Sequence, residues 1–187
     1  MRELILEKEI IVNKAICRTI GVITFVLFTC LGAYIRIPLP FTPVPITLQT
    51  FFVLLSGAVL GKFGIISQSG YIILGILGLP VFSNAGSGIT YLLGATGGYL
   101  IGFLLASYLV GKVIYNKESY LSIFILMCIA NLIILSLGTI WLKFSLKIDI
   151  DKALFLGFFP FLPGDLLKIM LASFLSLKIK SRTKEIL

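Results

Sequence analysis

Two charged residues, Asp165 and Lys168, lie within a long apolar segment near the end of the chain. A charge near the centre of a bilayer costs roughly 2.5–3.5 kcal/mol, so it requires a partner or an aqueous cavity. A spacing of three places both side chains on one helical face, where a carboxylate and an ammonium group can pair. The same groups can also hydrogen-bond a polar ligand, the carboxylate as acceptor and the ammonium as donor. Two interpretations are therefore open, a structural ion pair and the polar floor of a ligand site, and the neighbouring segments favour the second.

Two further segments carry polar side chains between apolar runs. The first, Pro38–Gln49, contains four prolines that favour a stiff, extended connection, and it ends with Thr47 and Gln49. The second, Gly78–Gly88, is a glycine-rich loop that offers two hydroxyl groups and the amide of Asn84. Each segment alone is compatible with an ordinary connecting loop. The membrane topology described below places both segments on the same side of the membrane as the charged pair, which favours a shared ligand site.

The composition predicts an integral membrane protein. Of the 187 residues, 58% are hydrophobic and 13% are charged, and the mean hydropathy is +1.10. Soluble domains carry about 25% charged residues, so this chain has more apolar surface than one small core can bury. We expect one membrane domain over residues 1–187, embedded in a lipid bilayer. The net charge of +8 does not indicate nucleic-acid binding, because the basic residues gather in short segments between apolar runs.

The sequence lacks the residue patterns of an enzyme, and we expect no catalytic residue, metal ligand or cofactor. Histidine is absent, and the three cysteines lie in or beside apolar runs without the spacing of metal ligands. The nearest match to a phosphate-binding loop, Gly57–Phe63, is one residue short and lacks the final hydroxyl group. The chain therefore has no ATPase motif of its own.

Apolar length predicts an all-α bundle of six transmembrane helices. With a cytoplasmic N-terminus, eleven of the 16 Lys and Arg residues lie on the inner side and four on the outer side, and Lys168 lies within a span. This asymmetry favours a multi-pass protein of the cell (plasma) membrane with both termini in the cytoplasm. The approximate spans are residues 19–35, 46–60, 64–79, 91–110, 119–142 and 153–177.

Small residues recur at a spacing of four along the fourth predicted span, at Gly94, Gly98, Gly102 and Ala106. Such a stripe lets two helix backbones approach closely, which favours helix association in lipid. We interpret it as a packing surface within the bundle.

At three blocks the sequence resembles the BioY family, the biotin-specific S components of energy-coupling factor (ECF) transporters. The blocks are Pro43–Thr50, Gly75–Gly102 and Pro163–Lys168, and the similarity runs from about residue 31 to residue 168. The three blocks occur in order at fitting spacings, which makes the resemblance more specific than any one of them.

The resemblance implies a six-helix subunit that captures biotin from the external side. Its expected partners are biotin, a transmembrane coupling protein (the T component) and a pair of cytoplasmic ATPases that supply the energy. The family's biotin-binding positions correspond to Asn84, Asp165 and Lys168. The neighbouring matched segments add three weaker candidates: Thr47, Gln49 and Tyr91. Biotin is then the transported ligand and not a cofactor.

Two alternatives remain open at the level of the sequence. The chain could be an S component for another vitamin, or a self-sufficient secondary carrier or channel. A binding screen distinguishes the first alternative, and transport by the chain alone distinguishes the second. The sequence also leaves open whether Lys168 contacts the ureido carbonyl or the carboxylate of biotin.

Overall fold

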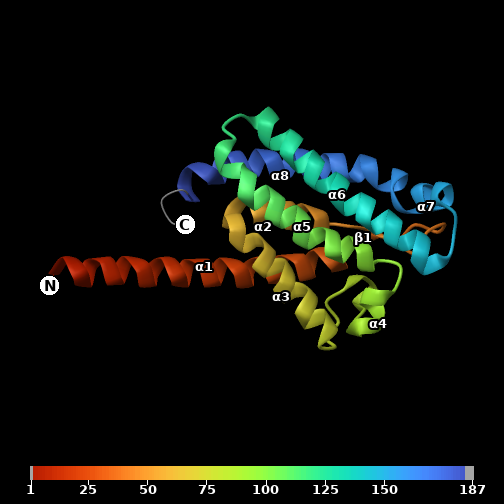
Figure 1. Cartoon of the computed structure of the whole chain (residues 1–187), viewed down its shortest axis with the longest axis horizontal. Helices are drawn as coiled ribbons and strands as arrows, with labels where there is room; N and C mark the ends of the chain where they lie inside the picture. The colour runs from red at the N-terminus through yellow and green to blue at the C-terminus, as the bar shows by residue number, and fades with distance from the viewer. Residues whose placement is uncertain (1, 184–187) are drawn as a thin grey trace.

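The computed structural model describes the backbone of residues 2–183 and the side chains of residues 14–179. Its long helices pack side by side in one elongated bundle (Figure 1). The α-helices are α1 (Arg2–Tyr34), α2 (Gln49–Leu60), α3 (Gly64–Ile76), α4 (Gly88–Leu93), α5 (Gly97–Val113), α6 (Tyr120–Leu146), α7 (Ile150–Gly157) and α8 (Leu162–Thr183). The 3₁₀ turns are η1 (Gly61–Phe63), η2 (Ser83–Ala85), η3 (Ile114–Asn116) and η4 (Phe159–Phe161). The antiparallel strands are β1 (Arg36–Ile37) and β2 (Ile46–Thr47).

The all-α membrane architecture agrees with the sequence, although the number of spans differs. Within the described residues, five helical segments are long and apolar enough to cross a membrane, against the six predicted. One of the five, Gln49–Ile76, contains both α2 and α3. Gly61 has φ 60° and ψ −134°, a conformation that glycine adopts readily, and it turns the chain between the two helices. A Cβ atom on Gly64 would lie 2.8 Å from the Cα atom of Gly57, so α3 begins directly against α2.

Two predicted spans are interrupted where the sequence suggested continuous helices. The predicted span 91–110 is divided into α4 and α5, because Gly94 takes an extended conformation with ψ −168°. The predicted span 153–177 is divided into α7, η4 and α8. Pro160 and Pro163 lie at this second break, where the absence of their backbone N–H groups disfavours a continuous helix. In addition, the start of the predicted span 46–60 pairs with β1 as strand β2.

The predicted packing surface is confirmed at Gly98 and Gly102, which lie against α6, whereas Gly94 lies in the linker before α5. A Cβ atom on Gly98 would lie 2.4 Å from the carbonyl oxygen of Leu137, and one on Gly102 would lie 2.8 Å from Cα of Ile134. Ala106 continues the same face and is fully buried. These contacts bring two backbones together, which is how helices associate in a lipid environment.

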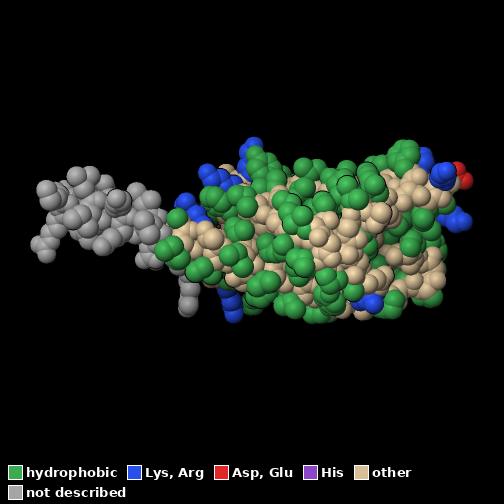
Figure 2. Space-filling view, turned by 90° about the horizontal axis from the view of Figure 1, so that it is seen from below, with side chains coloured by type: hydrophobic (Ala, Val, Ile, Leu, Met, Phe, Trp, Pro, Cys, Tyr) green, Lys and Arg blue, Asp and Glu red, His purple; other side chains and the backbone are tan. Residues whose placement is uncertain are grey.

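The start of α1 and the end of α8 lie at the same end of the bundle, while β1, α4 and α7 lie at the opposite end (Figure 1). Lys and Arg side chains lie at both ends of the bundle, including the end from which α1 projects (Figure 2). The helix ends and turns on this side contain Lys14, Arg18, Lys62, Lys112, Lys117 and Lys178. The shared position of the two helix termini agrees with an even number of crossings. Their cytoplasmic location stays a prediction from the positive-inside rule.

Replacing Gly102 by valine is expected to destabilise the contact between α5 and α6. The new side chain would press on the backbone of Ile134, and overpacking of this kind costs about 1–3 kcal/mol. Thermal unfolding of the purified protein in detergent measures the effect. Gly164→Ala is the control, because its Cβ atom would meet only the Cγ2 atom of Ile46 at 3.6 Å. A Gly102→Val variant that unfolds at the wild-type temperature would contradict this packing.

Candidate functional site

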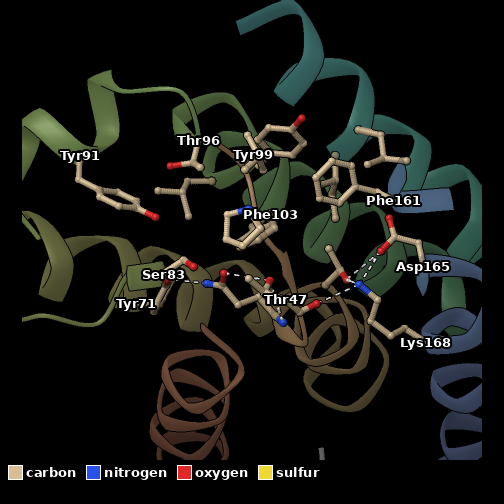
Figure 3. A pocket seen from close by; sticks show the side chains of 17 residues that line it. Thr47, Tyr71, Ser83, Tyr91, Thr96, Tyr99, Phe103, Phe161, Asp165 and Lys168 are labelled. Carbon is tan, nitrogen blue, oxygen red and sulfur yellow. Dashed lines mark hydrogen bonds and ion pairs between the residues drawn. The ribbon is translucent and has the colours of Figure 1, made fainter. Parts of the chain in front are cut away.

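A cavity of about 530 Å³, counted to its opening, lies among the helices at the end of the bundle that holds α4 and α7 (Figure 3). It is lined by Val44, Pro45, Thr47, Gln49, Thr50, Tyr71, Ser83, Tyr91, Thr96, Tyr99, Leu100, Phe103, Ile134, Leu135, Phe161, Asp165 and Lys168. Five of the six predicted site residues therefore line one cavity, although they come from distant parts of the sequence.

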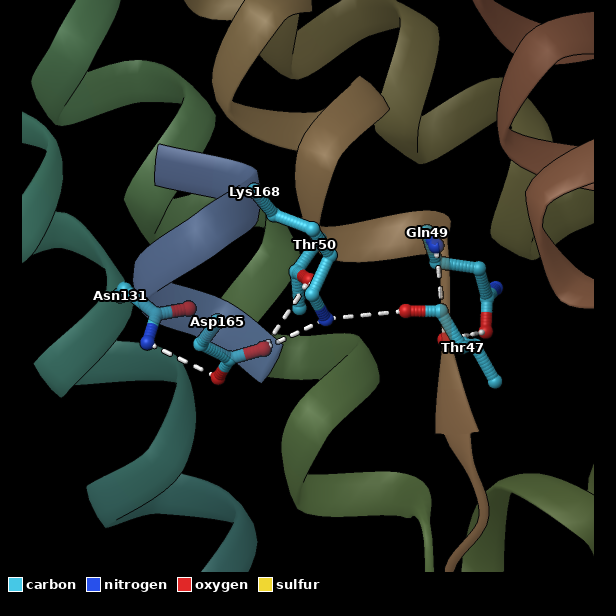
Figure 4. Close-up of polar contacts among 6 residues, drawn as sticks. All are labelled: Thr47, Gln49, Thr50, Asn131, Asp165 and Lys168. Carbon is cyan, nitrogen blue, oxygen red and sulfur yellow. Dashed lines mark hydrogen bonds and ion pairs between the residues drawn. The ribbon is translucent and has the colours of Figure 1, made fainter. Parts of the chain in front are cut away.

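Asp165 and Lys168 form a buried ion pair at one end of this cavity, with 2.5 Å between Nζ and Oδ1. The Lys168 ammonium also donates to the carbonyl oxygen of Thr47 at 2.9 Å and to Oγ1 of Thr50 at 2.7 Å (Figure 4). An ammonium group has three donors, and here each has a protein partner. A ligand that hydrogen-bonds to Lys168 must therefore replace one of these contacts.

The second oxygen of the Asp165 carboxylate is held by Asn131 of α6, whose Nδ2 donates to Oδ2 at 2.9 Å. The Thr50 hydroxyl lies 3.4 Å from Oδ1 and can donate to it while accepting from Lys168. This network joins α2, α6 and α8 around one neutral pair of charges. Neither Asn131 nor Thr50 was among the site residues predicted from the sequence. The signal for Asn131 was a single amide in the middle of the long apolar segment that forms α6.

A second group of polar side chains begins at Gln49 and leads away from the ion pair. Gln49 donates through Nε2 to the Tyr71 hydroxyl at 2.5 Å, and its Oε1 accepts from the Thr47 hydroxyl at 3.2 Å. The Tyr71 hydroxyl donates in turn to the carbonyl oxygen of Val81 at 3.3 Å. Tyr71, which the sequence analysis also missed, is fully buried and ties α2 and α3 to the loop that follows α3.

Tyr91 lies on the cavity wall supplied by α4. Its ring stacks on Phe82 with 4.8 Å between centroids, and Phe82 meets the Tyr71 ring edge-on at 5.5 Å. Burial raises the pKa of the Tyr91 phenol above its ordinary value, and nearby hydroxyl groups of Thr96 and Ser83 offset only part of this effect. The phenol therefore stays protonated at neutral pH and is available as a hydrogen-bond donor.

Asn84 is the one predicted site residue that does not line the cavity. It is exposed and has φ 62°, and Ala85 has φ 54°, so the loop turns here through two left-handed residues. The preceding residue, Ser83, is buried and faces the cavity instead. The binding role of Asn84 stays a prediction that this structure does not support with a contact.

Apolar side chains separate the hydroxyl groups of Tyr91 and Thr96 from the charges of Asp165 and Lys168. In Figure 3, Tyr91 and Thr96 lie on one side and Asp165 and Lys168 on the other, with Phe103 between them. The remaining apolar lining is supplied by Val44, Pro45, Leu100, Ile134, Leu135 and Phe161. Within residues 14–179, no three His, Cys, Asp or Glu side chains are grouped to hold a metal ion. The arrangement suits a small organic molecule with polar groups at both ends of an apolar body.

The fold and the cavity together define a multi-pass membrane protein that binds a small molecule between its helices. The chain belongs to the BioY family, whose model matches residues 8–185. The resemblance found in the sequence is thereby confirmed.

Two curated relatives and one solved structure illustrate the similarity. The biotin transporter BioY of Thermotoga maritima is 45% identical over 159 residues, which cover 82% of this chain and 92% of that protein. The probable biotin transporter BioY of Pyrococcus horikoshii is 39% identical over 160 residues, which cover 85% and 93%. The crystal structure of the S-component for biotin from an ECF-type ABC transporter superposes with a TM-score of 0.85 at 26% identity. That match covers 90% of this chain and 93% of the other.

Lys168→Met is expected to destabilise the protein more than the double variant Asp165→Leu/Lys168→Met. The single variant leaves the Asp165 carboxylate buried without its counter-charge, and breaking a buried pair in this way costs about 3–5 kcal/mol. The double variant removes both charges. Thermal unfolding without added ligand measures both. If the double variant unfolds at the lower temperature, the ion pair does not have the structural role assigned to it here.

Proposed function

We propose that this chain captures biotin from the external side of the membrane as the substrate-specificity subunit of an ATP-driven ECF vitamin importer. The observation that carries the proposal is the cavity, in which the Asp165–Lys168 pair faces an apolar section with further polar groups beyond it. Membership of the BioY family and the biotin-related names of the relatives support the same ligand.

Biotin offers groups that complement this lining. Its ureido ring has two N–H donors and one carbonyl acceptor, and its side chain ends in a carboxylate. Asp165 can accept from a ureido N–H, while Lys168 can donate either to the ureido carbonyl or to the carboxylate. Charge-assisted hydrogen bonds of this kind are stronger than neutral ones. In either orientation, biotin exchanges one of the internal contacts of Lys168 for a contact of its own.

The apolar body of biotin matches the apolar middle of the cavity in chemical character. The fused rings and the methylene chain would pack on Phe103, Phe161 and Leu100, which removes apolar surface from water. The opposite polar group then receives the other end of the molecule, through the hydroxyl groups of Tyr91 and Thr96. With the ureido ring at the charged pair, both Asp165 and Lys168 gain a ligand contact, whereas the reverse orientation gives one to Lys168 alone, because the biotin carboxylate has no N–H to donate to Asp165.

The energy for import comes from partner proteins in this proposal. The sequence contains no phosphate-binding loop, so ATP hydrolysis is assigned to a pair of cytoplasmic ATPases coupled through a transmembrane T component. The similarity to an S-component of an ECF-type ABC transporter supports such an assembly. The alternatives are an S component for another vitamin and a carrier that works alone.

Asp165→Asn is expected to weaken biotin binding by about 1–3 kcal/mol, because the charged acceptor for the ligand and for Lys168 is lost. Calorimetric titration of the detergent-solubilised protein measures the affinity. Asp149→Asn is the matched control, since Asp149 is exposed at the start of α7 and is expected to bind biotin like the wild type. Unchanged affinity in a folded Asp165→Asn variant would exclude the proposed role of Asp165.

The same titration with thiamine and riboflavin tests the identity of the ligand. One-to-one binding of biotin and neither of the other vitamins is expected. Binding of another vitamin in preference to biotin would support an S component with a different substrate and would refute biotin as the ligand.

The chain reconstituted alone in liposomes is expected to bind biotin without accumulating it, because it has no energy source of its own. Addition of the T component and the ATPase pair with ATP should produce uptake. Radiolabelled biotin measured inside the liposomes gives the readout. Uptake by the chain alone, driven by a biotin or ion gradient, would instead establish the secondary carrier.

A further inference from the structure

Trp141 of α6 is hydrogen-bonded to the short linker between α4 and α5. Its indole Nε1 donates to the carbonyl oxygen of Gly94 at 2.9 Å. Among the described residues, this is the only side-chain hydrogen bond to the backbone of the linker, Gly94–Thr96. Trp141 is also the only tryptophan in the chain. The bond therefore ties the linker to a long membrane helix through one identifiable side chain.

The linker leaves the helical path at Gly94, which takes an extended conformation. A Cβ atom on Gly97 would lie 1.7 Å from the carbonyl oxygen of Leu92, so the chain folds back tightly against α4. In an uninterrupted helix the Gly94 carbonyl would accept from the amide of Gly98, four residues later. Here it accepts from the Gly97 amide at 3.3 Å and from the indole of Trp141. The indole thus supplies a hydrogen bond at the point where the helix is broken.

The linker and α4 carry the polar wall of the cavity that lies across from the ion pair. Tyr91 belongs to α4 and Thr96 to the linker, and both line the cavity (Figure 3). A shift of the linker would therefore move both side chains relative to Asp165 and Lys168. Tertiary contacts that fix a wall in this way reduce the cost of ordering it when a ligand binds.

We infer that Trp141 is a positioning residue for ligand binding, which acts by holding the α4–α5 linker so that Tyr91 and Thr96 face the cavity. The inference rests on the proposed function for the identity of the ligand, biotin, and assigns Trp141 no direct contact with it. The linker geometry itself can be tested without any ligand.

The first test replaces Trp141 by phenylalanine, which keeps an aromatic ring and removes the N–H donor. Biotin affinity measured by calorimetry is expected to fall about two- to tenfold, the effect of one hydrogen bond. Tyr120→Phe is the matched control. This control removes a hydroxyl that donates to the Met170 carbonyl at 3.5 Å. Tyr120 belongs to α6, like Trp141, but lies at the opposite end of the bundle. The control should bind biotin like the wild type, and a wild-type affinity for Trp141→Phe would overturn the inference.

A double-mutant cycle separates positioning from a general loss of stability. Tyr91→Phe should weaken binding, and its effect should be smaller in the Trp141→Phe background, because both changes act on the same wall. Asp165→Asn lies at the other end of the cavity, so its effect should multiply with that of Trp141→Phe. Independent effects of Trp141→Phe and Tyr91→Phe, or no effect of Tyr91→Phe alone, would refute the assigned role.

A ligand-free measurement distinguishes failure of this inference from failure of the proposed function. Ala95, which is half-buried in the linker, is replaced by cysteine in a chain whose native cysteines are changed to alanine. Thiol labelling at this position should become about two- to tenfold faster with Trp141→Phe, since one hydrogen bond to the linker is lost. An unchanged labelling rate would overturn the inference. If Trp141→Phe speeds labelling but the protein with Trp141 intact does not bind biotin, the proposed ligand is refuted and the linker contact is retained.

Discussion

The structure depends on neutralising two charges inside an apolar bundle. Asp165 and Lys168 are buried among helices that face lipid, where an unpaired charge is unfavourable. Their pairing, with Thr50 from α2 and Asn131 from α6, fixes the positions of three helices relative to one another. The same groups can bind a ligand, so the interaction that stabilises the empty cavity also supplies its chemistry. Binding must therefore exchange existing contacts for new ones, which favours a ligand with donors and acceptors in a matching arrangement.

Helix α5 packs closely against α6 with one face and lines the cavity with another. The small-residue face of α5 lies against the backbone of α6 at Gly98 and Gly102, so little volume separates the two helices on that side. Leu100 and Phe103, on the same helix, line the cavity instead. One helix thus serves both as a packing surface and as a wall of the site. In lipid, where burial of apolar surface does not drive helix association, this division of faces is an effective way to build a pocket.

The cavity wall opposite the ion pair is organised differently. Its side chains come from a short helix and a linker, which are held by an aromatic cluster and by the indole of Trp141. The charged end is therefore held by an ion pair and side-chain hydrogen bonds, and the opposite end by ring contacts and one indole hydrogen bond. The energy for release belongs, in the proposed assembly, to the ATPase partners.

The sequence by itself determined the class of protein, the charged pair and most of the polar segments that meet at the site. Composition and apolar length are sufficient for a membrane bundle, and a spacing of three on a helix shows that Asp165 and Lys168 share a face. The three blocks Pro43–Thr50, Gly75–Gly102 and Pro163–Lys168 indicated the family. These properties are local, because each depends on composition or on spacing within a single segment.

Tertiary structure alone decided which distant residues complete the site. Asn131 reaches Asp165 across 34 positions in the sequence and Thr50 reaches it across 115, distances at which spacing carries no information about contact. The break in the helix at Gly94 could not be predicted from the sequence either, because the carbonyl of Gly94 accepts a hydrogen bond from Trp141, which belongs to another helix. Asn84 and Ala85 have left-handed backbone angles and lie outside the cavity lining, whereas the neighbouring Ser83 lines it; the binding role of Asn84 stays a prediction. Each outcome depends on how helices pack, which places side chains by contact between elements and not by position along one of them.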